Sequence, residues 1–272
     1  MHHITHSLSG VFRIYPQFHS RFLDAEHDVL VYLPRIYDTD QNRRFPVFYL
    51  HDGQNLFDGA TSYSGQEWGV DETAEFLIGS GAIEPLIIVG INNAGDDRVE
   101  EYTPTKDRRI GKGGKAELYG RMLIEEVKSF IDAEYRTLPG PANTGLGGSS
   151  LGGLVSLHLG LAHPEIFGKL AVISPSVWWD DRLILRRVLS LDSKPKLRIW
   201  LDIGTAEGER VTEEARLLCE ALIEKGWKLG VDLAYEEAHG AGHNEDAWAD
   251  RVSPLLKFLF PAPKPQILKT RS

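Results

Sequence analysis

Cysteine is almost absent from this sequence, since Cys219 is the only one among 272 residues. A chain with one thiol forms neither an internal disulfide nor a cysteine metal site. Cys219 lies in a run of residues with the apolar spacing of a buried helix face. We therefore expect it to pack in the core.

Long apolar runs and runs of basic residues are also missing. Nowhere do about 18 to 20 uncharged apolar residues follow one another, and the first residues lack the basic start and apolar block of a signal peptide. These absences favour a cytoplasmic protein that does not enter a membrane. The formal charge of −9 without a long basic run argues against binding to nucleic acid. The expected partner is a small molecule, and the sequence carries no signal for an oligomeric state.

The composition is that of an ordinary globular protein, with 42% hydrophobic and 25% charged residues. No repeat occurs, and no glycine, serine or proline linker divides the chain before its last residues. We predict one domain over residues 1–262, followed by a short tail over residues 263–272.

Short apolar runs alternate along the chain with longer helical patterns. The eight runs cover residues 11–15, 28–34, 45–53, 85–93, 143–149, 169–176, 197–205 and 231–238. The first two are expected to form an antiparallel edge, and the others have the continuous apolar character of strands covered on both faces. One helix is expected near residues 117–135, with these apolar residues on one face: Leu118, Met122, Val127, Phe130 and Ile131.

This alternation predicts an α/β fold with a mostly parallel central sheet of about eight strands and helices on both faces. In such sheets, ligand sites form beyond the carboxyl ends of the strands. Chemistry should therefore be sought just after each strand.

A G-x-S-x-G motif follows the fifth run, with Gly148, Ser150 and Gly152 at its fixed positions. This motif requires a sharp strand-to-helix turn that holds the serine in a strained conformation between small neighbours. The apolar residues that come next can form a buried helix: Leu154, Val155, Leu157, Leu159 and Leu161. Ser150 is the candidate nucleophile, and the motif is typical of an α/β-hydrolase.

A serine hydroxyl needs a base within hydrogen-bond reach and an acid that orients the base. In α/β-hydrolases the chain order is serine, acid, histidine. Two histidines, His239 and His243, follow the last strand run. We prefer His243 because it directly precedes a helix start, with Asn244 as a plausible cap.

Two acidic residues near the seventh run are candidates for the third member of the triad. Glu207 lies in the loop beyond the strand end, three residues past Gly204, whereas Asp202 lies inside the strand. We prefer Glu207 as the acid and keep Asp202 as the alternative. A simpler role for Glu207 is to stabilise the N-terminus of the following helix.

The negative charge that develops on a carbonyl oxygen needs preorganised donors. These are usually the amide after the nucleophile and an amide from the loop after the third strand. Here those amides belong to Leu151 and Gln54. No metal and no organic cofactor is implied.

Four segments, at residues 50–58, 147–154, 173–179 and 242–248, occur in an order that resembles one esterase family. This family includes enterochelin-type, feruloyl and acetylxylan esterases and is similar to esterase D. The resemblance spans roughly residues 45–260. It implies an α/β-hydrolase fold, Ser150 as nucleophile, Glu207 as acid, His243 as base, and an oxyanion hole lined by Gly53 and Gln54.

The substrate side has weaker signals. The candidates for pocket residues are Asp58, Arg98, Glu101, Tyr102, Trp178 and Trp179, and each tryptophan could equally be a packing residue. The basic, glycine-rich segment at residues 105–115 is either a lid that attracts an anion or a solvated loop.

The expected activity is that of a serine esterase, which hydrolyses a carboxylic ester through an acyl-enzyme. An acylated sugar, a feruloyl or acetyl ester and a siderophore-type ester are all compatible with these residues. The alternatives are an acyltransferase with the same triad and a non-catalytic binding protein on a hydrolase scaffold.

Overall fold

The computed structural model describes residues 8–263 and contains an eight-stranded sheet. The strands are β1 (Val11–Phe18), β2 (His27–Leu33), β3 (Val47–His51), β4 (Ile87–Ile91), β5 (Thr144–Ser149), β6 (Lys169–Ile173), β7 (Arg198–Gly204) and β8 (Leu233–Ala238). The last six lie within the predicted runs, whereas β1 extends three residues beyond its run and β2 begins one residue before its run.

The strand order in the sheet is β1-β2-β4-β3-β5-β6-β7-β8. Strand β2 pairs antiparallel with both β1 and β4, whereas β3 to β8 run parallel. The predicted antiparallel edge and the mostly parallel sheet are therefore confirmed. Because β3 to β8 are parallel, the loops that follow them meet at one edge of the sheet.

A helix follows each strand from β2 to β8. The α-helices are α1 (Ile36–Thr39), α2 (Val70–Gly79), α3 (Arg98–Glu101), α4 (Ala116–Arg121), α5 (Ser129–Glu134), α6 (Leu151–Ala162), α7 (Trp179–Leu189), α8 (Glu209–Glu224) and α9 (Glu245–Leu259). Short 3₁₀-helices are η1 (Gly53–Asn55), η2 (Gly95–Asp97) and η4 (Pro141–Asn143), and η3 (Met122–Lys128) is a π-helix.

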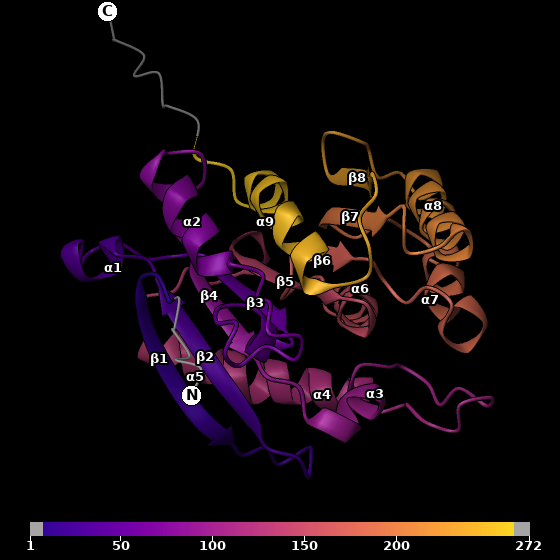
Figure 1. The fold of residues 1–272 in the computed structure, drawn as a ribbon, viewed down its shortest axis with the longest axis horizontal. Coiled ribbons are helices and arrows are strands. Elements are labelled where there is room, and N and C mark those ends of the chain that lie inside the picture. Colours follow the sequence, from indigo (N-terminus) through magenta and orange to yellow (C-terminus); the bar gives the residue numbers. More distant parts are fainter. Residues whose placement is uncertain (1–7, 264–272) are drawn as a thin grey trace, which may run out of the picture.

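The two faces of the sheet pack against different helices (Figure 1). Along β3, Val47 and Tyr49 join the cluster that includes α4, α5, α6 and α8, while Phe48 and Leu50 join the cluster with α2 and α9. Successive side chains of a strand point to opposite faces, so a strand that is apolar throughout must be covered on both. The predicted three-layer architecture is confirmed.

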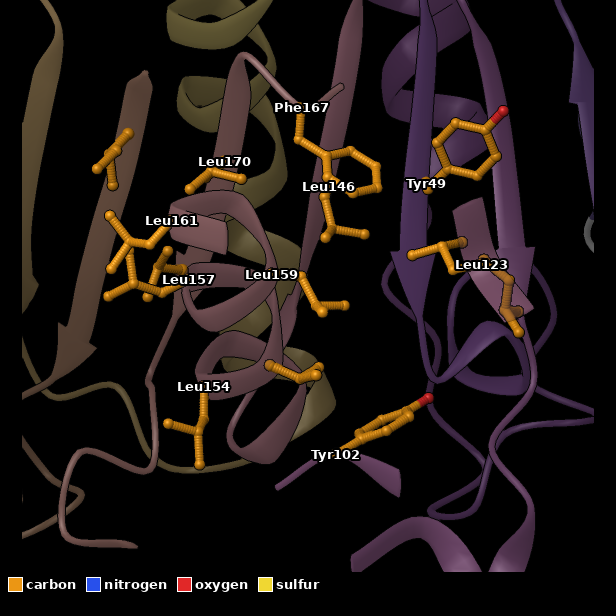
Figure 2. Packing of buried hydrophobic residues seen from close by; sticks show 14 of the residues in the cluster. Tyr49, Tyr102, Leu123, Leu146, Leu154, Leu157, Leu159, Leu161, Phe167 and Leu170 are labelled. Carbon is orange, nitrogen blue, oxygen red and sulfur yellow. The ribbon is translucent and has the colours of Figure 1, made fainter. Parts of the chain in front are cut away.

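Helix α6 is buried on nearly all sides, from Leu151 to Leu161. Figure 2 shows its leucines packed among residues of the sheet, including Leu146 and Leu170. Each fully buried leucine contributes roughly 1.5–3 kcal/mol relative to an exposed one, so this packing fixes the helix that follows the candidate nucleophile. Cys219 on α8 is also buried, as predicted.

The helix expected at residues 117–135 is present but interrupted by the π-helix η3. The prediction that Leu118 lies on the buried face is wrong, because this side chain is exposed. Met122 and Val127, five positions apart, are both fully buried. A π turn holds more residues than an α turn, so the buried face shifts around the helix relative to a 3.6-residue period.

Residues 264–272 of the predicted tail lie outside the described residues. Within the part of the chain that the structure describes, no helix is both long and apolar enough to span a membrane.

Candidate active site

Ser150 occupies the sharp turn between β5, which ends at Ser149, and α6, which begins at Leu151. Its backbone has φ 59° and ψ −119°, a region that costs a non-glycine residue about 1–3 kcal/mol. The turn is held by two backbone hydrogen bonds of 3.0 Å, from Ser150 N to Ile173 O and from Ser176 N to Ser150 O. The predicted strand–turn–helix context of the motif is therefore present.

The two motif glycines give this turn the space it needs. A Cβ atom on Gly148 would lie 3.0 Å from the Cβ of His51 and 3.2 Å from the backbone of Gly152. A Cβ atom on Gly152 would lie 3.4 Å from both His51 and Asp52. The nucleophile turn thus packs directly against the end of β3 and the loop that follows it.

This β3 loop carries the candidate oxyanion-hole amide of Gln54. Asp52 precedes it in a left-handed conformation with φ 56°, and a Cβ atom on Gly53 would lie 2.7 Å from the backbone of Gly90. Leu151 is the first residue of α6 and Gln54 the second of η1, and amides in the first turn of a helix have no partner within it. Both N–H groups are therefore of the type that can bind an oxyanion.

The conformation of this loop is fixed by an ion pair and a hydrogen bond to Asp52. Arg98 donates to its two carboxylate oxygens through Nε and Nη2, each at 2.7 Å, and Asn93 donates at 2.7 Å. A bidentate arginine–carboxylate pair is strong and geometrically specific. Asn93 also donates its backbone N–H to Oε1 of Gln54 at 3.2 Å, which ties the β4 loop to the candidate oxyanion loop.

His243 lies in the loop between β8 and α9, and its Nδ1 is 2.6 Å from Oε2 of Glu207. The carboxylate can only accept, so Nδ1 carries the proton and donates it. Asn244 caps α9, as predicted, by accepting from Ala247 N at 3.0 Å. A Cβ atom on Gly204 would lie 2.3 Å from Ala241 O, so a glycine at the end of β7 lets the histidine loop approach.

The second oxygen of Glu207 is also fully engaged. Oε1 accepts from Ser174 Oγ at 2.6 Å and from Gly204 N at 2.8 Å. Burial alone raises the pKa of Glu207, but its hydrogen bonds with His243, Ser174 and Gly204 outweigh burial and hold that pKa below its usual range. Glu207 is therefore ionised when it faces the imidazole.

Asp202, the alternative acid, does not contact His243. It is fully buried within β7, where it accepts from Arg251 Nη1 and Trp200 Nε1, each at 2.6 Å. Burial raises the pKa of Asp202 to about 6, although Arg251 opposes the shift. Of the two predicted acids, the structure thus brings Glu207 to the imidazole. His239, the alternative base, is exposed in the turn directly after β8 and does not line the cavities that Ser150 lines.

Ser150 and His243 line the same two cavities. Among the residues that the structure describes, these two side chains are not hydrogen-bonded to each other. The Ser150 hydroxyl lies instead 3.4 Å from Ser176 Oγ. Hydrogen bonds of catalytic groups are often long without substrate and tighten when it binds. The imidazole is 45% exposed, whereas the carboxylate behind it is 2% exposed, so its free edge faces the cavities.

The two cavities have different linings apart from Ser150 and His243. The larger has a volume of about 580 Å³, and its polar wall includes Gln54, Asn55, Asn93, Asp96, Arg98 and Glu245. The smaller has a volume of about 250 Å³, and its apolar wall includes Pro175, Trp178, Ile203 and Val211. Ester substrates have two halves, and this site offers two unlike compartments that meet at one hydroxyl.

The predicted substrate contacts fall into two groups. Arg98 lines the larger cavity and Trp178 the smaller one. Asp58, Glu101, Tyr102 and Trp179 are buried and lie outside both linings. Figure 2 shows Tyr102 in the hydrophobic packing, and its hydroxyl accepts from Asp52 N at 3.3 Å, so it supports the loop from behind.

Segment 105–115 does not cover the Ser150 cavities. Arg109 lines a separate cavity of about 320 Å³, which shares Trp178 and Val211 with the smaller cavity. Asp107 holds the segment by accepting from the backbone N–H groups of Arg109 at 2.7 Å and Ile110 at 3.1 Å.

Sequence reasoning did not identify several residues around the site. Ser174, Ser176, Trp248 and Arg251 all contact the candidate triad or its supports. Three of them lie in segments 173–179 and 242–248, whose motif character was the available signal. Within residues 8–263, no group of three or more His, Cys, Asp or Glu side chains is arranged to hold a metal ion.

Known proteins are similar to this chain in sequence and in fold. The family model described as "Putative esterase" matches residues 20–259. The protein YbbA of Bacillus subtilis is 27% identical over 85% of this chain and 91% of its own length. The endo-1,4-beta-xylanase/feruloyl esterase of Xylanibacter ruminicola is also 27% identical, over 85% of this chain and 29% of its own length.

Among solved structures, an IroE-like serine hydrolase from Shewanella oneidensis has a TM-score of 0.74. It is 21% identical, and the superposition covers 92% of this chain and 80% of that one. This likeness and the strand order establish the predicted α/β-hydrolase fold. Since the family model spans most of the sequence, the chain belongs to the Esterase family of carboxylic-ester hydrolases.

Proposed function

We propose that this esterase acts through a covalent acyl-enzyme, with Ser150 as nucleophile, His243 as base and Glu207 as the acid that orients the base. The observation that carries the proposal is the 2.6 Å hydrogen bond between His243 Nδ1 and Glu207 Oε2 at a cavity that Ser150 also lines. With the proton on Nδ1, the second nitrogen, Nε2, is basic and available to the serine hydroxyl.

In the first step, the proton of Ser150 Oγ passes to His243 Nε2 while Oγ forms a bond to the ester carbonyl carbon. The carbonyl oxygen becomes an oxyanion, which accepts from the amides of Leu151 and Gln54. The bond between the carbonyl carbon and the alcohol oxygen then breaks, and the imidazolium returns its proton to the alcohol. In the second half of the reaction, a water molecule gives a proton to His243 Nε2 and its oxygen bonds to the acyl carbon. The bond between that carbon and Ser150 Oγ then breaks, the imidazolium returns its proton to Oγ, and the carboxylic acid product leaves.

Glu207 contributes by compensating the imidazolium that forms in each step. Its carboxylate is 2% exposed, where solvent screens charge poorly. The hydrogen bonds that keep it ionised therefore also keep it ready to stabilise positive charge on His243. This is an interaction that strengthens in the transition state, as catalysis requires.

The unlike cavities support an ester with one polar and one compact apolar half. Amide and carboxylate groups of Asn55, Asn93 and Glu245 on the larger wall suit a polyhydroxylated group, and the exposed ring of Tyr63 borders it. The smaller cavity, beside Trp178, suits a short acyl or aromatic group. Among the ester classes compatible with the sequence, an acylated sugar fits these walls well.

The charge of the larger cavity supports the same class. Its described lining carries the carboxylates of Asp52, Asp96 and Glu245 and the guanidinium of Arg98, which is engaged by Asp52. A substrate half with its own negative charge meets net repulsion there. For partly exposed groups this effect amounts to about 0.2–1 kcal/mol, or up to about fivefold in rate.

The test is a panel of esters that varies acyl length, leaving group and charge, assayed with the native chain and with Ser150→Ala. We expect hydrolysis by the native chain, a loss of at least about 10³-fold in Ser150→Ala, and kcat/KM values that fall from neutral to anionic leaving groups. Equal hydrolysis by both chains would contradict the proposal. Product analysis with added alcohols measures how far water is the preferred acceptor.

A further inference from the structure

One hydroxyl, that of Ser174, joins the candidate acid to the protein interior. Ser174 directly follows β6, and its Oγ is 2.6 Å from Glu207 Oε1. The same Oγ is 3.1 Å from Trp248 Nε1 and 3.3 Å from Arg251 Nη1. Ser174 itself is 2% exposed, so water does not compete for these bonds.

The chemistry of the partners fixes the direction of the hydroxyl proton. Indole and guanidinium nitrogens only donate, so Trp248 and Arg251 occupy the acceptor sites of Ser174 Oγ. Its one proton then points to Glu207, which accepts it. Because the hydroxyl cannot rotate away from Glu207 without losing these bonds, it holds the carboxylate in one orientation.

Arg251 is itself anchored between two carboxylates. It is 2% exposed, and its Nη1 donates to Asp202 Oδ1 at 2.6 Å, while Nη2 lies 4.0 Å from Glu207 Oε1. The charge of Arg251 balances one of the two carboxylates, and the other remains to compensate an imidazolium on His243. A buried guanidinium is stable only when carboxylates pair with it, as Asp202 and Glu207 do here.

The backbone at Ser174 is strained in a way that serves this contact. Its φ is 41°, a left-handed value that costs a non-glycine residue about 1–3 kcal/mol. The strained amide donates to the backbone oxygen of Asp202 at 3.0 Å and lies 3.2 Å from its Oδ1. A glycine would adopt this conformation more easily but would lack the hydroxyl.

We propose that Ser174 is a positioning residue for Glu207, with Trp248 and Arg251 fixing the direction of its hydroxyl. This inference rests on the proposed function, because it assigns Ser174 a role only through Glu207 and His243. The ring of Trp248 also packs edge-on against His243, with centroids 4.9 Å apart, so one indole contacts both the base and the support of the acid.

The consequence is a defect in kcat with little change in KM. Without the Ser174 hydroxyl, Glu207 keeps its bond to Gly204 but loses the partner that restricts its rotation. The imidazole is then held less firmly for proton transfer, which affects the transition state more than substrate binding. We expect kcat to fall by about 10- to 100-fold, within the range that general-base catalysis contributes.

The test uses two substitutions, Ser174→Ala and Ser174→Gly, in the full chain. Both remove the hydroxyl, but the glycine also relieves the backbone strain, so we expect Ser174→Gly to be less destabilised than Ser174→Ala. The matched control is Ser156→Ala, which removes a fully buried hydroxyl that donates only to Gly152 O, at 2.7 Å. We expect both Ser174 variants to lose kcat while the control retains it.

Three readouts separate positioning from a general structural defect. Thermal unfolding reports folding. Proton NMR reports the His243 Nδ1–H, which we expect to exchange faster with water in the Ser174 variants. In the Glu207→Gln background, Ser174→Ala should lower kcat no further, because the residue through which it acts is already lost. An additive loss in that background would overturn the inference, as would wild-type kcat in Ser174→Gly.

The outcome also distinguishes this inference from the proposed function. If a fluorophosphonate fails to label Ser150 in the native chain, the proposed function itself is wrong. If the native chain is labelled and both Ser174 variants are labelled at the native rate, the triad stands and only the positioning role is wrong.

Discussion

His243 and Glu207, 36 positions apart in the chain, are joined by a 2.6 Å hydrogen bond between Nδ1 and Oε2. The bond links the loop after β8 to the loop after β7, at the edge of the sheet where parallel strands end. The imidazole is half-exposed toward the cavities and the carboxylate is buried behind it. This order of exposure is the one that a base and its orienting acid require.

The first prediction concerns the identity of the acid. Glu207→Gln keeps the size of the side chain but replaces the ionised acceptor by an amide, which no longer selects the Nδ1–H form or compensates the imidazolium. We expect kcat to fall by about 10³- to 10⁴-fold with little change in folding. Steady-state kinetics and thermal unfolding measure the two effects.

The control for this variant is Glu209→Gln, two residues further along the chain in the exposed first turn of α8. It removes a carboxylate of the same type that does not contact the imidazole, so we expect native kinetics. Comparable losses in both variants would show that Glu207 has no special role.

The second prediction concerns backbone strain at the nucleophile. Ser150 has φ 59°, which glycine tolerates and alanine does not. Both Ser150→Ala and Ser150→Gly remove the hydroxyl, but we expect the glycine variant to be more stable than the alanine variant by about 1 kcal/mol. Chemical denaturation with the same m-value for both measures the difference. Equal stability, or a less stable glycine variant, would show that the turn is unstrained.

The third prediction concerns the loop that carries the Gln54 amide. Arg98→Lys keeps the charge but loses the bidentate contact with Asp52. We expect kcat to fall about tenfold because the loop moves away from the position that the oxyanion requires. Arg109→Lys, at an exposed arginine outside the Ser150 cavities, is the control. If Arg98→Lys and its control behave alike, the Asp52 contact does not position the loop.

The fourth prediction is a pH dependence of stability that arises at His51. Burial lowers the pKa of His51 to about 3, although Asp52 opposes the shift, and its Nδ1 lies 2.8 Å from the hydroxyl of Tyr119. The unfolded chain binds a proton at His51 below about pH 6.5, whereas the folded chain does not until about pH 3. The free energy of unfolding therefore falls as the pH falls through this window.

The slope attributable to one such histidine is about 1.4 kcal/mol per pH unit. We expect His51→Leu to remove this slope between pH 6 and pH 4, as measured by urea unfolding at a series of pH values. His239→Leu, at an exposed histidine, should leave the slope unchanged. A native slope in His51→Leu would show that other groups cause the acid sensitivity.

Much of the fold followed from apolar pattern alone. All eight strands coincide with apolar runs. The signal is clearest for β3, β4 and β5, which are buried throughout, because strands covered on both faces leave little room for polar residues. The exposure of Leu118 did not follow, because a π turn changes the period and leaves no clear mark in the sequence. Local pattern specifies that a helix forms, whereas packing decides which of its faces is buried.

The sequence likewise predicted some residues of the candidate site and not others. Ser150 and His243 were predicted from a motif and from chain order, since both follow strands whose ends must meet. The contacts of Ser174 and Arg251 were not predicted, because they connect β6 to α9 and have no fixed spacing in the sequence. The burial of Tyr102 and Trp179 was likewise open, since large aromatic residues occur in cores and in pockets alike.

Covalent labelling with a fluorophosphonate, followed by mass spectrometry of the digested protein, tests the role of Ser150 most directly. We expect one adduct per chain on the Ser150 hydroxyl, formed slowly in Glu207→Gln and absent in Ser150→Ala. An adduct on another residue, or ester hydrolysis by a chain that is never labelled, would contradict this role.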